Sequence, residues 1–98
     1  MILANDIFEE CEELAGRLTA IRVNFPDTEV RVKHAIYQLR ELLKSPKEET
    51  IYRVVDELQD LKKYLNDIRK LDPPSLDKPF RPCIELIERL LGPTEVLH

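Results

Sequence analysis

Residues 71–91 read "LDPPSLDKPFRPCIELIERLL", and this stretch decides how many helices the chain forms. Four prolines fall within ten of its residues, directly after a segment with helical periodicity. Because proline lacks a backbone N–H and disfavours helical geometry in the residue before it, residues 72–81 are predicted to form an extended, partly polyproline-like connector. Pro82 fits the first turn of a new helix, and Gly92 marks its end. The stretch therefore predicts a proline-rich connector and then a short C-terminal helix over residues 82–91.

The short C-terminal helix is amphipathic along its whole length. One apolar line contains Ile84, Ile87 and Leu91, and an adjacent line contains Cys83, Leu86 and Leu90. A helix of about ten residues is marginal in isolation, so its order has to come from packing. We expect it to fold onto its own bundle, with docking on a second chain or on a partner as the alternative. The motif "IERLL" matches the helical docking pattern Leu-x-x-Leu-Leu, which makes Ile87, Leu90 and Leu91 candidate partner-binding residues.

Upstream of this stretch, apolar residues recur in steps of three and four, which predicts helices over residues 5–24, 28–44 and 46–71. The first set is Ala4, Ile7, Cys11, Leu14, Leu18, Ile21 and Phe25; the second is Val32, Ile36, Leu39 and Leu43, broadened by Ala35 and Leu42; the third is Ile51, Val54, Leu58, Leu61, Leu65 and Ile68. Each set predicts one continuous apolar seam that faces a core.

Turn and cap signals separate these three helices. Pro26 ends the first helix, and Asp27 or Thr28 is predicted to cap the second. In "SPKE", Ser45 is predicted to cap the third helix, with Pro46 at the first helical position and Glu48 completing a capping box. The short spacing predicts a tight hairpin between the second and third helices.

These patterns predict an all-α fold, a mainly antiparallel bundle of three to four helices in a single domain over residues 1–98. The chain has 43% apolar and 35% charged residues and only two glycines, a composition that is typical of helical bundles. The strict heptads of the first and third helices exceed what a monomer needs. They are compatible with a homodimer in which long helices pair between chains.

Charge and cysteine usage limit the possible partners and compartment. The net charge is −4 and the pI is about 5.2, and this composition argues against dedicated binding to nucleic acid or to an anionic membrane, which needs a concentrated positive field. No apolar run is long enough to span a bilayer, and no signal peptide is expected. Cys11 and Cys83 lie far apart in the sequence and are expected to be reduced, buried thiols. We therefore expect a cytoplasmic protein without membrane contact.

Residue types that carry chemistry are present but not arranged for it. His34 falls on the solvent side of its helix, and neither it nor His98 has a second ligand at the spacing of a helical metal pair. Three pairs of carboxylates fall opposite the apolar seams, where no cleft can perturb their pKa values: Glu9 with Glu13, Asp56 with Asp60, and Glu85 with Glu88. We therefore expect no enzyme activity, no catalytic residue, no cofactor and no metal.

Two tyrosines are the clearer functional signal. Tyr37 follows the seam residue Ile36, and Tyr52 follows the seam residue Ile51, so both rings are predicted to point away from the core. Tyrosine is enriched at protein interfaces because it combines a large contact area with a polar tip. Tyr37 and Tyr52 are therefore candidate partner-binding residues, with isolated surface tyrosines as the alternative.

The segment "EETIYRVVDEL", residues 48–58, resembles the recognition helix of winged-helix repressors, with Thr50, Tyr52 and Arg53 matching in type. Winged-helix proteins normally end this helix at a glycine and continue into strands, whereas here the helical pattern runs on. The resemblance implies, as the alternative function, a helix-turn-helix-like transcriptional regulator that binds DNA through residues 28–71. The main prediction is a non-catalytic adaptor, regulator or small subunit that binds another protein or itself through apolar helical faces.

Overall fold

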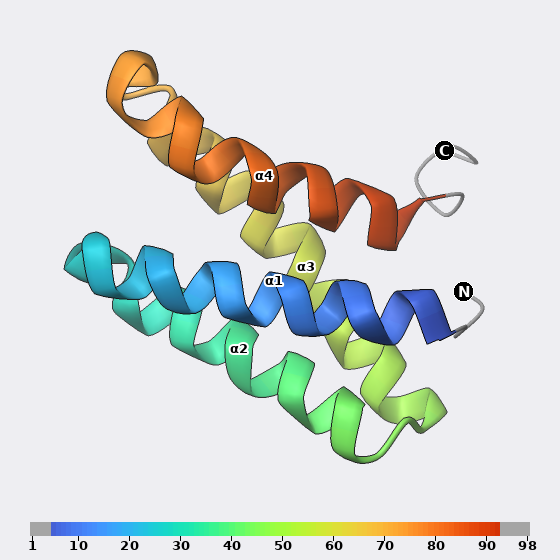
Figure 1. The fold of residues 1–98 in the computed structure, drawn as a ribbon. Coiled ribbons are helices and arrows are strands. Elements are labelled where there is room, and N and C mark those ends of the chain that lie inside the picture. The colour runs from blue at the N-terminus through green and yellow to red at the C-terminus, as the bar shows by residue number, and fades with distance from the viewer. Residues whose placement is uncertain (1–4, 93–98) are drawn as a thin grey trace.

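The computed structural model describes residues 5–92, with side chains from Phe8 onward, and within them the chain is an all-α bundle (Figure 1). Its elements are α1 (Asn5–Asn24), the 3-10 turn η1 (Pro26–Thr28), α2 (Glu29–Lys44), α3 (Glu48–Arg69) and α4 (Pro73–Leu91). The predicted fold class is confirmed, and the first three helices lie within two residues of their predicted bounds.

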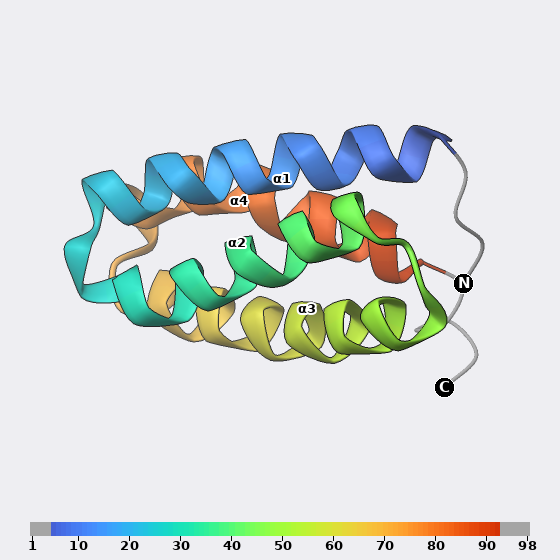
Figure 2. The ribbon, with the colours of Figure 1, turned by 90° about the horizontal axis from the view of Figure 1, so that it is seen from below.

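Each helix runs antiparallel to the next one in the chain and packs against it, and α4 closes the bundle against α1 (Figures 1 and 2). Figure 2 shows α1 and α3 on opposite sides of the bundle, with α2 and α4 between them. The Cα atoms extend over 37 × 28 × 19 Å. Each helix therefore turns one face to the core, two flanks to its neighbours and one face outward.

The core takes buried side chains from all four helices. From the first three the apolar ones are Cys11, Leu14, Ala15, Leu18, Ile21, Val32, Ala35, Ile36, Leu39, Leu42, Val54, Leu58, Leu61 and Leu65. The seam residues Phe25, Leu43, Ile51 and Ile68 are partly buried at its margin. The predicted positions Ala4 and Ile7 lie outside the residues whose side chains are described. Because both heptad seams are satisfied within one chain, they provide no reason for pairing between chains.

The predicted connector over residues 72–81 is wrong, because α4 begins at Pro73 and is helical through all four prolines. Pro73 and Pro74 occupy the first turn, where no intrahelical N–H bond is needed. The N–H groups of Ser75 and Leu76 then bond to the Asp72 carbonyl oxygen at 3.1 and 2.9 Å. The first half of this helix is therefore started by the very residues that were predicted to prevent it.

Pro79 and Pro82 lie inside α4, where each removes one backbone hydrogen bond at a cost of about 3 kcal/mol. The carbonyls that lose their donors belong to Ser75 and Lys78, two exposed residues. Burial along the other side of the helix offsets this cost, since a buried large apolar side chain contributes about 1.5–3 kcal/mol. The buried residues of α4 are Phe80, Cys83, Ile84, Leu86, Ile87, Leu90 and Leu91. Tertiary packing thus overrides the local preference of the prolines.

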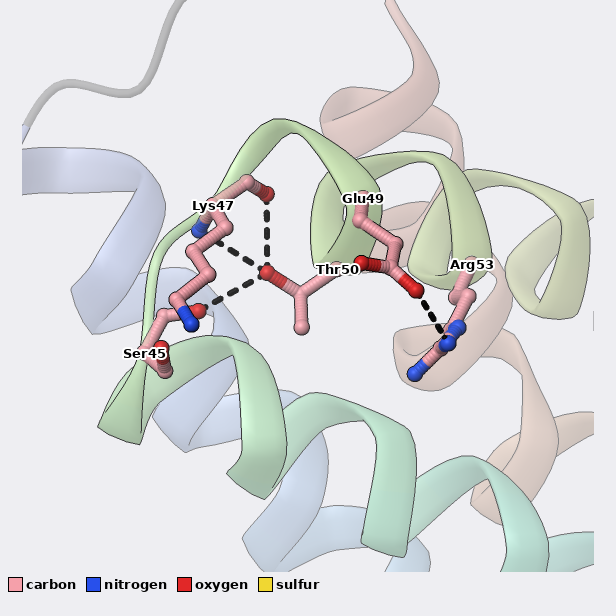
Figure 3. Close-up of polar contacts among 5 residues, drawn as sticks. All are labelled: Ser45, Lys47, Glu49, Thr50 and Arg53. Carbon is pink, nitrogen blue, oxygen red and sulfur yellow. Dashed lines mark hydrogen bonds and ion pairs between the residues drawn. The ribbon is translucent and has the colours of Figure 1, made fainter.

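The start of α3 also differs from the prediction, because the helix begins at Glu48 rather than Pro46 and Glu48 does not complete the cap. Instead, the Thr50 hydroxyl accepts a hydrogen bond from the Lys47 N–H at 2.9 Å (Figure 3). The same hydroxyl lies 2.8 Å from the carbonyl oxygens of Ser45 and Lys47, to which it donates. A threonine side chain therefore fixes the turn between α2 and α3.

Candidate functional site

The outward side of α2 carries an exposed apolar stripe, which we call the α2 face and define by Val30, Lys33, His34 and Tyr37. Val30 is 84% exposed and Tyr37 is 58% exposed. With Glu29, these four residues line a shallow depression on the surface. Val30 and Tyr37 are seven residues apart, two helical turns, so they lie on one line along the helix. Two exposed apolar side chains on one line, beside a shallow depression, make this face the candidate contact surface.

Both predicted tyrosines are on the surface, and each is held by a glutamate of its own helix. The Tyr37 hydroxyl donates to Glu41 at 2.9 Å, and the Tyr52 hydroxyl donates to Glu48 at 3.0 Å. These hydrogen bonds, and then the negative charge of the glutamates, raise the pKa of both tyrosines above the usual 10.0. Both phenols therefore stay protonated at neutral pH and present a ring whose polar tip is already bonded.

The two tyrosines leave their helices in different directions. The positive charge of Arg53 lowers the pKa of Tyr37 and so opposes the effect of Glu41. Arg53 therefore lies on the side of α3 that adjoins α2. Tyr52 precedes Arg53 by one residue, so its side chain leaves α3 about 100° further round the helix. Tyr37 thus belongs to the α2 face, whereas Tyr52 lies on a separate part of the α3 surface.

Beside the α2 face lies a buried carboxylate that the sequence reasoning missed. Glu57 on α3 is only 7% exposed. Its Oε1 lies 2.8 Å from His34 Nδ1 and 3.4 Å from Arg31 Nη1, both on α2. The Arg31 guanidinium also lies 5.9 Å from the centre of the Tyr64 ring, within range of a cation–π interaction. Since a buried carboxylate is unfavourable without partners, Arg31 and His34 are tied to α3 at this point.

This contact refines the prediction for His34, which is exposed as expected but is not simply solvated. A hydrogen bond to an ionised carboxylate requires the proton on Nδ1, because the carboxylate can only accept. Glu57 therefore fixes the orientation of the imidazole ring beside Val30 and Tyr37. The signal was present in the sequence, since Glu57 stands three residues after Val54 and four before Leu61, the spacing of the seam itself.

The residues that resemble a winged-helix recognition helix are engaged within the chain. Thr50 is bonded in the turn, and Arg53 pairs with Glu49 one turn earlier (Figure 3). After α3 the described chain continues directly into α4, with no strand that could form a wing. Four basic residues lie near the end of α3: Lys62, Lys63, Arg69 and Lys70. Among them, Lys62 Nζ lies 3.5 Å from Glu88, and Arg69 Nη1 lies 3.4 Å from Asp77. These contacts do not support recognition of DNA bases by α3.

The three apolar candidates at the C-terminal helix are in the core. Ile87, Leu90 and Leu91 are buried where α4 packs on α1 and α3. The expected folding of this helix onto its own bundle is thus observed, and it begins nine residues earlier than predicted. Their side chains offer no surface to a partner while α4 stays in place, so they add nothing to the candidate surface.

Potentially reactive groups within the described residues are either inert or solvated. Cys11 and Cys83 are free and buried, as predicted, and burial is the main cause that raises the pKa of each thiol to about 11. The three predicted pairs of carboxylates are all exposed. From Phe8 to Gly92, no group of histidine, cysteine, aspartate and glutamate side chains is arranged to hold a metal ion. Among the described helices, none combines the length and apolar content that crossing a membrane requires.

Comparison with known proteins assigns no family to this chain. No protein-family model matches it, and no curated protein or solved structure is significantly similar to it. The α2 face therefore has to be interpreted from its own geometry.

Proposed function

We propose that this protein is a non-catalytic interaction module, an adaptor, regulator or small subunit, that binds another protein through the α2 face. The observation that supports this proposal most is the pairing of two large exposed side chains, Val30 and Tyr37, on one line of a helix whose opposite side is buried in the bundle. We place its action in the cytoplasm, because both cysteines are thiols rather than members of a disulfide.

The energetics of the α2 face suit a binding surface. Burying a valine side chain against a partner contributes about 1.5–3 kcal/mol, and tyrosine is among the residues that dominate binding energy at interfaces. The Tyr37 hydroxyl and the His34 ring are already held by Glu41 and Glu57. Side chains that are ordered before binding lose less conformational entropy when the partner arrives.

The test is affinity capture from the native host with the whole protein and with two variants of the α2 face, Val30→Ser and Tyr37→Ala. Both positions are exposed, so the free energy of unfolding of each variant is expected to stay within about 0.5 kcal/mol of the parent. The amount of partner captured by each variant should fall severalfold. Val23→Ser is the matched control, because Val23 is also an exposed valine, 71% exposed, but lies on α1 and outside the α2 face.

Two outcomes would contradict the proposal. Capture that is unchanged by Val30→Ser and Tyr37→Ala, in variants shown to be folded, would remove the α2 face as the binding surface. Equal loss with the Val23→Ser control would show that the contact is not specific to this face. Tyr52→Ala, measured in the same series, decides whether the surface extends onto α3.

A further inference from the structure

A row of positive charge runs along one edge of the α2 face. Lys33, Arg40 and Lys44, which we call the cation row, are spaced by seven and four residues, so they lie on one side of α2. All three are exposed, and within the described residues none of them forms an ion pair. Glu29, the carboxylate nearest the start of this edge, is engaged by Arg22 at 3.7 Å. Arg40 lines a depression together with Glu9, Glu12 and Glu13 of α1, so the positive charge of this edge without a neighbouring carboxylate is mainly that of Lys33 and Lys44.

From this arrangement we infer that the partner of the α2 face is an acidic amphipathic helix of another protein; this inference rests on the proposed function. The apolar side of such a helix covers Val30 and Tyr37, and its carboxylates lie along the cation row. Two packed helices run 8–10 Å apart, a distance at which flanking side chains reach one another. Opposite charges along that flank fix the register and raise the association rate.

A second copy of this chain fits the α2 face poorly. When two identical helices pack antiparallel about a two-fold axis, the same edge of each helix meets, so the cation row would face a second cation row. When they pack parallel, the cation row meets the opposite edge. That edge carries another cation, Arg31, and a glutamate, Glu41, that already accepts the Tyr37 hydroxyl. Neither arrangement gives Lys33 and Lys44 their counter-charges, whereas an acidic helix does.

A nucleic acid fits less well than a helix. Binding to duplex DNA relies on neutralising many phosphates, and an exposed valine and tyrosine gain little from a phosphate backbone. Three cations beside an apolar stripe match a ligand that carries carboxylates and aliphatic side chains together. Duplex DNA is therefore a competitor in the experiment rather than a second proposal.

The experiment uses the full chain and two synthetic helical peptides of about 18 residues, five turns. One peptide has leucine along one face with glutamate on both flanks, and the other has the same leucines with lysine on both flanks. Fluorescence anisotropy gives the affinity of each, at low and at moderate salt. The acidic peptide is expected to bind at least about tenfold more tightly, with an affinity that falls as salt screens the charges.

Charge reversal tests the cation row directly. The triple variant Lys33→Glu, Arg40→Glu, Lys44→Glu is expected to weaken binding of the acidic peptide about tenfold or more, from three exposed charge pairs. The control, Lys63→Glu, Lys70→Glu, Lys78→Glu, changes the net charge equally at exposed positions on α3, directly after it and on α4, and is expected to leave binding nearly unchanged. Circular dichroism establishes that both variants keep their helices.

Several results would overturn the inference. These are an acidic peptide that binds no more tightly than the basic one, equal weakening by both triple variants, no binding of either peptide, or displacement of the acidic peptide by duplex DNA. The proposed function fails separately, when Val30→Ser leaves partner capture unchanged. Partner capture that depends on Val30 but not on the cation row would keep the proposed function and remove only the acidic helix.

Discussion

Replacing Phe80 by alanine tests whether the first half of α4 is packed against the bundle or is a solvated connector. Phe80 is fully buried, and its ring packs edge-on against Phe25, with 5.3 Å between ring centres and 84° between ring planes. Removing a buried phenylalanine costs about 3–5 kcal/mol, the sum of lost apolar burial and the cavity left behind. That is a large share of the ~5–15 kcal/mol that stabilises a domain. Phe80→Ala is therefore expected to lower the free energy of unfolding by about 3–5 kcal/mol.

The measurement is urea unfolding followed by circular dichroism, with Ser75→Ala as the control in the same segment. Ser75 is exposed, so its variant is expected to stay within about 0.5 kcal/mol of the parent. A double-mutant cycle with Phe25→Ala should give a coupling of about 0.5–1.5 kcal/mol for the ring pair. If Phe80→Ala changes the unfolding free energy no more than Ser75→Ala does, then residues 72–81 do not pack as α4 and the reasoning is refuted.

Three further predictions concern the backbone and the thiols. Gly16→Ala should raise the unfolding free energy by about 0.5–1 kcal/mol in the same assay, because Gly16 is in mid-helix and a Cβ there meets nothing within 4 Å. Thr50→Val should lower it by about 1 kcal/mol, since the variant keeps the shape of the side chain but loses the hydroxyl that caps α3. Burial raises the pKa of the Cys11 and Cys83 thiols from 9.0 to about 11, so the folded state keeps protons that the unfolded state releases in this interval. Stability measured against pH should therefore fall between pH 9 and 11, and a Cys11→Ala, Cys83→Ala variant should lose that part of the slope.

The spacing of apolar residues predicted the helices whose local sequence favours a helix. It failed for α4, where tertiary packing determines where the helix begins. The seams of α1 and α3 follow from the spacing of apolar residues, and their buried positions agree with it. The error in α4 came from applying the local rule for proline without weighing burial. Apolar residues continue in steps of three and four through the prolines, at Leu76, Phe80, Cys83, Ile87 and Leu91. That periodicity was the signal that the helix begins before Pro82.

The candidate surface was predicted in part. The register that put Ile36 in the core also put Tyr37 outside, and the structure places it there. Val30, seven residues before Tyr37 on the same line, was missed because a single valine outside the seam is an ordinary surface residue and by itself gives no signal in the sequence. The capping role of Thr50 was missed because Ser45 and Pro46, five and four residues earlier, gave a stronger local signal. In each case the pattern was present, but only the packed helices show which signal prevails.

Glu57 connects the core to the α2 face, and its presence is hard to explain by stability alone. Replacing a buried ion pair by apolar residues of similar size is often neutral or stabilising, so a buried carboxylate is weak support for a fold. What Glu57 does provide is position, because it holds His34 Nδ1 at 2.8 Å and Arg31 Nη1 at 3.4 Å. These two side chains border the exposed stripe, and under the proposed function their order would lower the entropy lost on binding. A buried carboxylate that apolar residues could often replace without loss of stability, but that orders the edge of an exposed apolar stripe, suits the binding surface proposed on α2.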